Sequence, residues 1–125
     1  MKKRTKNNTS DRQFLPLIAT DYHAHSTFSP DARDSIPAMC AQAHLRGIKT
    51  LAITDHAEWH PQWCTQPNWE RYFAAIADAR VQYAEAPLEI LTGVELGNPH
   101  QFLDEVRPFL DTYQFDVTVL SVHWL

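Results

Sequence analysis

The chain has 125 residues, of which 44% are hydrophobic and 21% charged, so its length and composition suit a single globular domain. Residues 1–12 contain five basic residues and one acidic residue, which leaves six basic and 14 acidic residues, a net charge of −8, for the rest. Such an acidic body argues against nucleic acid as a partner, and no apolar run reaches the length of a membrane span.

The amino-terminal segment and the two cysteines lead to expectations about disorder and location. The basic segment lacks the apolar stretch of a signal peptide, and we expect residues 1–13 to form a disordered basic tail before a domain over residues 14–125. Cys40 and Cys64 are isolated rather than a Cys-x-x-Cys pair, which favours a reducing compartment. We therefore expect a cytoplasmic protein without membrane partners.

The first predicted element is a buried strand over Phe14–Ala19, followed by the sequence Asp-Tyr-His-Ala-His-Ser at residues 21–26. In an extended segment residues i and i+2 point to the same side, so His23 and His25 present two imidazoles together. That pair suits a divalent transition metal, and Asp21 is placed to orient one of the ligands. His-x-His alone is a weak pattern, and the alternative is a strand end with two exposed histidines.

Three more strand and helix signals follow in alternation. Helical spacing of apolar residues predicts helices between Ser35 and Gly47, between Asn68 and Glu85, and from residue 99 to residue 113. Pro108 should kink or split the third of these helices. Strands are predicted over residues 48–54, 88–96 and 115–122, and the order of the elements favours a parallel sheet with right-handed crossovers.

Each predicted strand leads to a candidate metal ligand. After the pair on the first strand come Asp55 and His56 on the second, Glu95 on the third and His123 after the fourth. Active sites of (β/α) barrels lie at the carboxyl ends of the strands, so we expect these side chains to meet. Imidazole nitrogens with carboxylate oxygens suit Zn, Mn or Fe, and a central glutamate can bridge two cations that activate water for attack on a phosphate ester.

The loop after the second predicted strand carries Trp59 and His60. Contact with a substrate and packing within the loop are equally expected for these two side chains.

Taken together, the motifs Asp-Tyr-His-Ala-His-Ser, Ile-Thr-Asp-His, Gly-Val-Glu and Ser-Val-His-Trp resemble those of the PHP (polymerase and histidinol phosphatase) superfamily over about residues 17–125. The most similar members are histidinol-phosphatase-like. This resemblance implies a distorted barrel that binds up to three divalent metal ions and hydrolyses a small phosphorylated substrate. It also implies the following ligands: His23, His25 and bridging Glu95 for the first metal, Glu95 and His123 for the second, Asp31 and His56 for the third, with Asp21 and Asp55 as supporting carboxylates.

A related eight-fold barrel runs to about 250 residues, so the resemblance further implies the amino-terminal part of such a domain. We expect a partial (β/α) barrel of about four parallel strands with three crossover helices, in which each metal lacks one family ligand. Open edges of the sheet should favour self-association. The leading hypothesis is a metal-dependent phosphomonoesterase. The alternatives are a phosphodiesterase or nuclease of the same superfamily, and a metal-binding fragment without catalysis.

Overall fold

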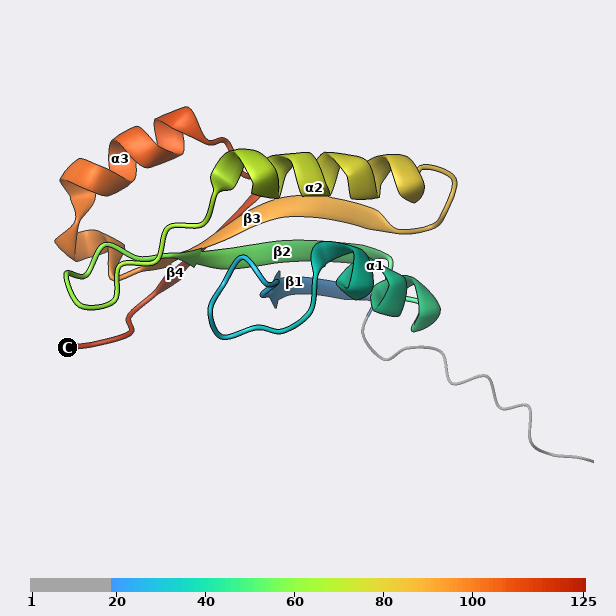
Figure 1. The fold of residues 1–125 in the computed structure, drawn as a ribbon, viewed down its shortest axis with the longest axis horizontal. Coiled ribbons are helices and arrows are strands. Elements are labelled where there is room, and N and C mark those ends of the chain that lie inside the picture. Colours follow the sequence, from blue (N-terminus) through green and yellow to red (C-terminus); the bar gives the residue numbers. More distant parts are fainter. Residues whose placement is uncertain (1–18) are drawn as a thin grey trace, which may run out of the picture.

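A computed structural model describes residues 19–125 and shows four parallel strands with helices between them (Figure 1). The strands lie side by side in chain order, β1–β2–β3–β4, which confirms the predicted partial (β/α) barrel. The elements are β1 (Thr20–Ala24), α1 (Ile36–Leu45), β2 (Thr50–Ala57), α2 (Trp69–Gln82), β3 (Glu89–Gly97), the 3-10 helix η1 (Pro99–Gln101), α3 (Leu103–Thr112) and β4 (Val117–Ser121).

The first strand runs further along the chain than the apolar pattern indicates. The predicted tail over residues 1–13, and residues 14–18 of the predicted strand, lie outside the described residues. Within them, β1 begins at Thr20 and includes His23, and it pairs with β2 from Thr20 opposite Thr50. The pairing shifts between Asp21 and Ala24, where the strand becomes irregular just before His25.

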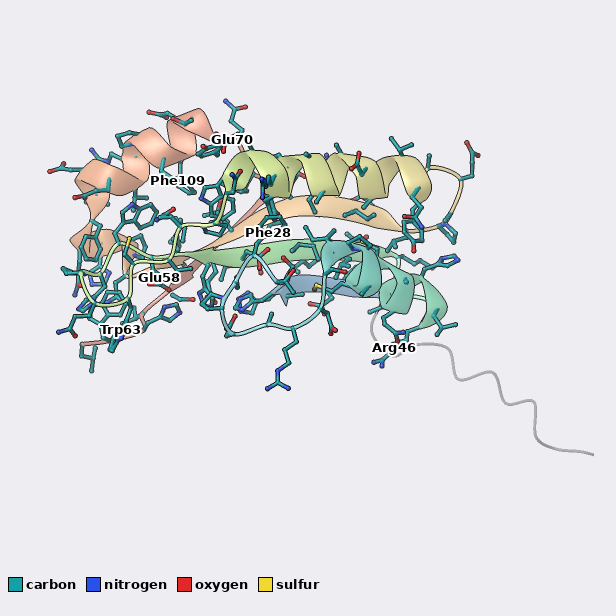
Figure 2. All side chains as sticks on the ribbon, viewed as in Figure 1. Phe28, Arg46, Glu58, Trp63, Glu70 and Phe109 are labelled. Atoms are coloured by element: carbon teal, nitrogen blue, oxygen red, sulfur yellow. The ribbon has the colours of Figure 1, made fainter. Side chains whose placement is uncertain are left out.

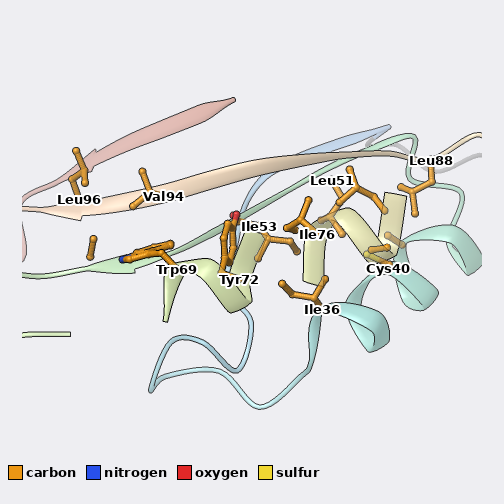
Figure 3. Packing of buried hydrophobic residues seen from close by; sticks show 14 of the residues in the cluster. Ile36, Cys40, Leu51, Ile53, Trp69, Tyr72, Ile76, Leu88, Val94 and Leu96 are labelled. Atoms are coloured by element: carbon orange, nitrogen blue, oxygen red, sulfur yellow. The ribbon is translucent and has the colours of Figure 1, made fainter. Parts of the chain in front are cut away.

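One hydrophobic core lies between the sheet and the helices (Figure 3). From β2 it takes Leu51 and Ile53, alternate residues that point to the helix side, as the period of two in a strand requires. Tyr72 and Ile76 of α2 are fully buried against them, one helical turn apart. The other members include Ile36 and Cys40 from α1, Ile90, Val94 and Leu96 from β3, and Val106 from α3.

The alternate residues of β2 and β3, His56 and Glu95 among them, point to the face of the sheet opposite the helices. In the register of this pair, His56 lies beside Glu95 and Ala57 beside Leu96. Because the two strands are parallel, their carboxyl ends meet at the same edge. The fold therefore brings the ligand-type residues of separate strands to one end of one face.

The third helical segment breaks at a different residue from the one predicted. Helix α3 runs unbroken through Pro108, and the interruption falls at Phe102, between η1 and α3. Phe102 has φ −134° and ψ 39°, outside the helical region. A proline removes one backbone donor, here in a helix whose other turns remain hydrogen-bonded, and it does not end this one.

None of the helices within residues 19–125 combines the length and the hydropathy needed to cross a membrane.

Candidate metal centre

Glu95 is the centre of the polar cluster at the carboxyl end of the sheet. Its side chain is 6% exposed, and its two oxygens face different histidines. Oε1 lies 3.0 Å from His23 Nε2, whereas Oε2 lies 2.6 Å from His56 Nδ1, 3.5 Å from His123 Nε2 and 3.7 Å from His25 Nε2. Ser121 on β4 also donates a hydrogen bond to Oε1. One carboxylate thus contacts imidazoles from the ends of three other strands.

Three groups of side chains in this region hold potential ligand atoms within 4.8 Å of one another. The first is the predicted set of His23, His25 and Glu95. The other two sets are larger than the family resemblance implies. One gains His56 and Glu58, and the other gains His25. They are His56, Glu58, Glu95 and His123, and His25, Asp31 and His56.

Outer partners fix how these imidazoles point. Thr54 donates to the carbonyl of Ala24, so its oxygen is free to accept from His23 Nδ1, 3.1 Å away. The Asp31 carboxylate accepts from His25 Nδ1 at 3.0 Å and from His56 Nε2 at 2.9 Å. Burial raises the pKa of Asp31, but the hydrogen bonds from the two histidines outweigh it and leave the pKa below its ordinary value. These contacts leave the opposite nitrogens of the rings directed at Glu95.

The residues present fit a divalent cation, because four buried atoms around the centre have no hydrogen-bond partner. They are His25 Nε2, His56 Nδ1, Glu58 Oε2 and Glu95 Oε2. His56 Nδ1 and Glu95 Oε2 are only 2.6 Å apart without forming a hydrogen bond. Buried polar atoms are normally paired, and lone pairs that face each other repel unless a cation lies between them.

The two aspartates expected to orient ligands contact other groups. Asp21 accepts from the backbone N–H of His23 rather than from its ring. Asp55 is completely buried and accepts from the N–H and hydroxyl of Ser26, at 2.7 and 2.6 Å, and from the hydroxyl of Ser29, at 2.7 Å. Asp55 therefore anchors the loop between β1 and α1, which carries Asp31, and within residues 19–125 it makes no hydrogen bond to an imidazole.

A cavity of about 510 Å³ opens beside the second ligand group. Its polar side includes Asp31, His56, Glu58 and His123, and its aromatic side is formed by Trp63 and Trp124. The lining residues, all within the described part of the chain, include no lysine or arginine: Pro30, Asp31, His56, Glu58, Gln62, Trp63, Cys64, Thr65, His123 and Trp124.

The two loop residues expected at this position lie outside the cavity lining. Trp59 packs against Phe109 of α3, with ring centroids 5.3 Å apart, and so joins the core. His60 stacks on Trp63 at 5.0 Å and contacts Trp124 edge-on at 4.5 Å. Trp59 thus packs against the core, and His60 packs against the two tryptophans that line the cavity.

Glu58 is the site residue that sequence reasoning missed. It follows β2 directly and lies two residues after His56, the same spacing that pairs His23 with His25. The apolar run of β2 indicates an end at Thr54, whereas the strand continues to Ala57. With the correct strand end, the i, i+2 rule would have placed Glu58 beside His56. Figure 2 shows its side chain at the end of the sheet where Trp63 also lies.

Comparison with known proteins agrees with this geometry. A family model described as "PHP domain" matches residues 21–124. A histidinol-phosphatase of Bacillus subtilis is 31% identical over 118 residues, covering 84% of this chain and 44% of that protein. One from Lactococcus lactis is 29% identical over 104 residues, covering 82% of this chain and 38% of that protein.

A crystal structure of histidinol phosphate phosphatase from Lactococcus lactis, complexed with Zn, L-histidinol and phosphate, superposes with a TM-score of 0.79 at 28% identity. The match covers 86% of this chain and 41% of that one. The chain thus spans less than half the length of the relatives it matches.

Proposed function

The chain belongs to the PHP domain family, and we propose that it supplies the metal-binding strands of a phosphomonoesterase site for a small phosphorylated substrate such as L-histidinol phosphate. The observation that carries this proposal is the set of four unpaired buried atoms, two imidazole nitrogens and two carboxylate oxygens, in the ligand groups at the carboxyl end of the sheet. The relative that was crystallised with Zn, L-histidinol and phosphate supports the choice of metal chemistry and substrate class.

The proposed ligands are those that the family resemblance also assigns. His23, His25 and Glu95 would hold one cation, and Glu95 with His56 and His123 a second, so that Glu95 serves both through its two oxygens. Asp31 would either hold a third cation or keep the rings of His25 and His56 in place. Zn, Mn or Fe bound here would activate water and neutralise the charge of a phosphate ester.

The cavity suggests how a substrate would lie. Since no lysine or arginine of the described residues lines it, its carboxylates would repel a phosphate group, which would therefore bind through the cations. The organic part of the substrate would then contact Trp63 and Trp124. Indole faces attract cationic and planar groups, a property that suits the ammonium and imidazole groups of histidinol.

Phosphodiester hydrolysis is the alternative activity of the same family. We place it second, because the body of the chain is acidic and a nucleic-acid backbone needs a basic surface. The remaining alternative is metal binding without turnover.

Turnover and metal content of the purified chain test the proposal together. We expect Zn²⁺ or Mn²⁺ to bind, and to support hydrolysis of L-histidinol phosphate in preference to bis(p-nitrophenyl) phosphate, a diester. A Glu95→Gln variant should lose both metal and turnover, whereas Glu89→Gln, an exposed residue of the same strand, should lose neither. Preferred hydrolysis of the diester would favour the alternative activity, and bound metal with neither reaction would favour a binding role.

We also propose a reducing, cytoplasmic location. Both cysteines are free thiols, and Cys40 is buried in the core while Cys64 is exposed.

A further inference from the structure

Glu58 and Gly97 lie side by side at the end of the β2–β3 pair. We propose that Glu58 is a ligand of the cation between His56, Glu95 and His123, and that Gly97 leaves the space its carboxylate needs. This inference rests on the proposed function. It adds a ligand that the family motifs in the sequence do not assign, and it makes this group the fullest donor set of the three.

The position of Glu58 follows from the strand register. His56 pairs with Glu95 and Ala57 with Leu96, so Glu58, the residue directly after β2, falls beside Gly97. A Cβ atom built on Gly97 would overlap the Glu58 carboxylate, and all three of its nearest atoms belong to that group. A glycine in a strand often marks a close approach of this kind.

Burial and charge show that Glu58 needs a cation. Its side chain is only 8% exposed, and its Oε2 atom has no hydrogen-bond partner. Among residues 19–125 the ion pair made by an arginine or lysine is Arg80 with Asp116, remote from this group in the sheet. With His56 and His123 neutral, as ligation by their rings requires, a carboxylate buried here would lack a positive partner and be strongly destabilising, and a bound cation would supply the charge.

The contacts of Glu58 Oε1 distinguish a ligand from a residue that only orients a histidine. Oε1 lies 2.6 Å from His123 Nδ1 and 3.3 Å from His56 Nδ1. An orienting role explains the first contact alone. His56 donates a hydrogen bond from its Nε2–H to Asp31. A neutral ring then has a lone pair on Nδ1, which lies between Glu58 and Glu95. A cation shared by these atoms would remove the repulsion between their lone pairs, and the 3.3 Å between His56 Nδ1 and Glu58 Oε1 is the spacing expected of donors about 2.0–2.1 Å from Zn²⁺.

The donor set has a consequence for affinity. Two carboxylates balance the two charges of the cation, and two neutral imidazoles complete four ligands, the usual number for a closed zinc site. The group of His23, His25 and Glu95 offers three. We therefore expect the cation beside Glu58 to be the most tightly held of those bound by this chain.

The test uses the full 125-residue chain loaded with Zn²⁺ or Co²⁺ and then passed over a desalting column. Metal content and the visible absorption of Co²⁺ are measured for wild type, Glu58→Gln, and Glu85→Gln, an exposed glutamate that serves as control. We expect Glu58→Gln to lose one equivalent or to bind it at least about 10-fold more weakly. The control should match wild type. A glutamine can still accept a proton from His123, so a residue that only orients this ring would show no loss.

Gly97→Ala provides a second test that changes no ligand. Its methyl group should displace the Glu58 carboxylate and reproduce the loss of one equivalent. In a Glu58→Ala background, where the space is free, the same alanine should have no further effect. Circular dichroism would verify that each variant is folded.

The outcomes separate the two proposals. Wild-type metal content and Co²⁺ spectra in Glu58→Gln would overturn the role of Glu58 and leave the proposed function intact. A wild-type chain that binds neither Zn²⁺ nor Co²⁺ would overturn the proposed function, and this inference with it.

Discussion

Two sets of polar side chains differ in where their hydrogen-bond partners come from. In the first, which we call the self-paired set, Asp55, Tyr72 and Asp116 find their hydrogen-bond partners within the chain. In the second, the ligand set, Glu58 and Glu95 lie among histidines, and the Oε2 atom of each has no hydrogen-bond partner. The self-paired set stabilises the fold by itself, whereas the ligand set opposes folding until a cation binds.

The two sets also differ in role: the self-paired set positions the ends of the strands, and the ligand set would bind the cations. Asp55 holds the loop that carries Asp31, and Tyr72 joins β2 to β3 through Ile53 and Gly93. These contacts fix the strand ends on which the ligand set stands. Changes in the self-paired set should therefore lower stability in the absence of metal, and changes in the ligand set should lower metal affinity.

The largest effect on stability should come from Asp55→Asn. The amide replaces an oxygen that accepts from a buried hydroxyl, so a donor would face Ser26 or Ser29. Hydrogen bonds to a charged group contribute about 1.5–3 kcal/mol each, and we expect the free energy of unfolding to fall by about 3 kcal/mol or more. Urea denaturation of the metal-free chain measures this. The exposed Asp78→Asn should stay within about 0.5 kcal/mol of wild type, and an equally small change at Asp55 would contradict the comparison.

Glu95→Gln should behave in the opposite way. Losing an oxygen shared by two ligand groups should weaken metal binding by about 100-fold or more, equivalent to about 2.7 kcal/mol. The metal-free chain should be as stable as wild type or more so, because an uncompensated buried charge is removed. Calorimetric titration with Zn²⁺ and urea denaturation with chelator test the two statements. A metal-free variant less stable than wild type would show that Glu95 belongs to the self-paired set.

Sequence reasoning predicted the elements and the convergence of ligands well, for a physical reason. Alternation of strands and helices appears in local hydrophobic spacing, and parallel strands must bring His23, His56, Glu95 and His123 to one edge. The family resemblance is confirmed by the domain match over residues 21–124.

What could not be predicted depends on contacts between distant residues. Asp55 accepts hydrogen bonds from Ser26 and Ser29, which lie far earlier in the chain, and no local pattern indicates this. The last residues of β2 include Asp55 and His56, so the apolar pattern that indicates a strand ends before the strand itself. Glu58 was missed for that reason. Trp59 joined the core because Phe109, 50 residues later, packs against it.

Tyr72→Phe should produce an intermediate loss. The hydroxyl donates to the carbonyl of Ile53 at 2.6 Å and accepts from the N–H of Gly93 at 2.7 Å, in a fully buried position. Burial also raises the pKa of Tyr72, so the hydroxyl keeps its proton. We expect the free energy of unfolding to fall by about 1–2 kcal/mol and the affinity for Zn²⁺ to stay unchanged. The matched control is Tyr83→Phe, because the hydroxyl of Tyr83 has no hydrogen bond among the described residues. Weaker Zn²⁺ binding in Tyr72→Phe would link this residue to the ligand set.

The smallest effect, and the one that depends on pH, belongs to Asp116. Burial raises its pKa, but hydrogen bonds from the N–H and hydroxyl of Thr92 and the charge of Arg80 outweigh this and lower the pKa below its ordinary value of 3.8. The folded chain therefore binds this proton less readily than the unfolded chain. The resulting stabilisation is complete above the ordinary pKa and is lost as the pH falls through the lowered one.

Asp116→Asn removes that contribution. The side chain is 46% exposed and its charge is screened by solvent. We therefore expect the free energy of unfolding at about pH 7 to fall by at most about 1 kcal/mol. At about pH 3 or below the difference from wild type should shrink, because the wild-type carboxylate then gains a proton as well. Urea denaturation at both pH values, with chelator present so that the ligand set binds no metal, measures the two differences. Asp111→Asn on the exposed side of α3 corrects for the loss of one surface charge. A difference that grows as the pH falls would mean that Asp116 stabilises the fold in its protonated form and that its pKa is raised.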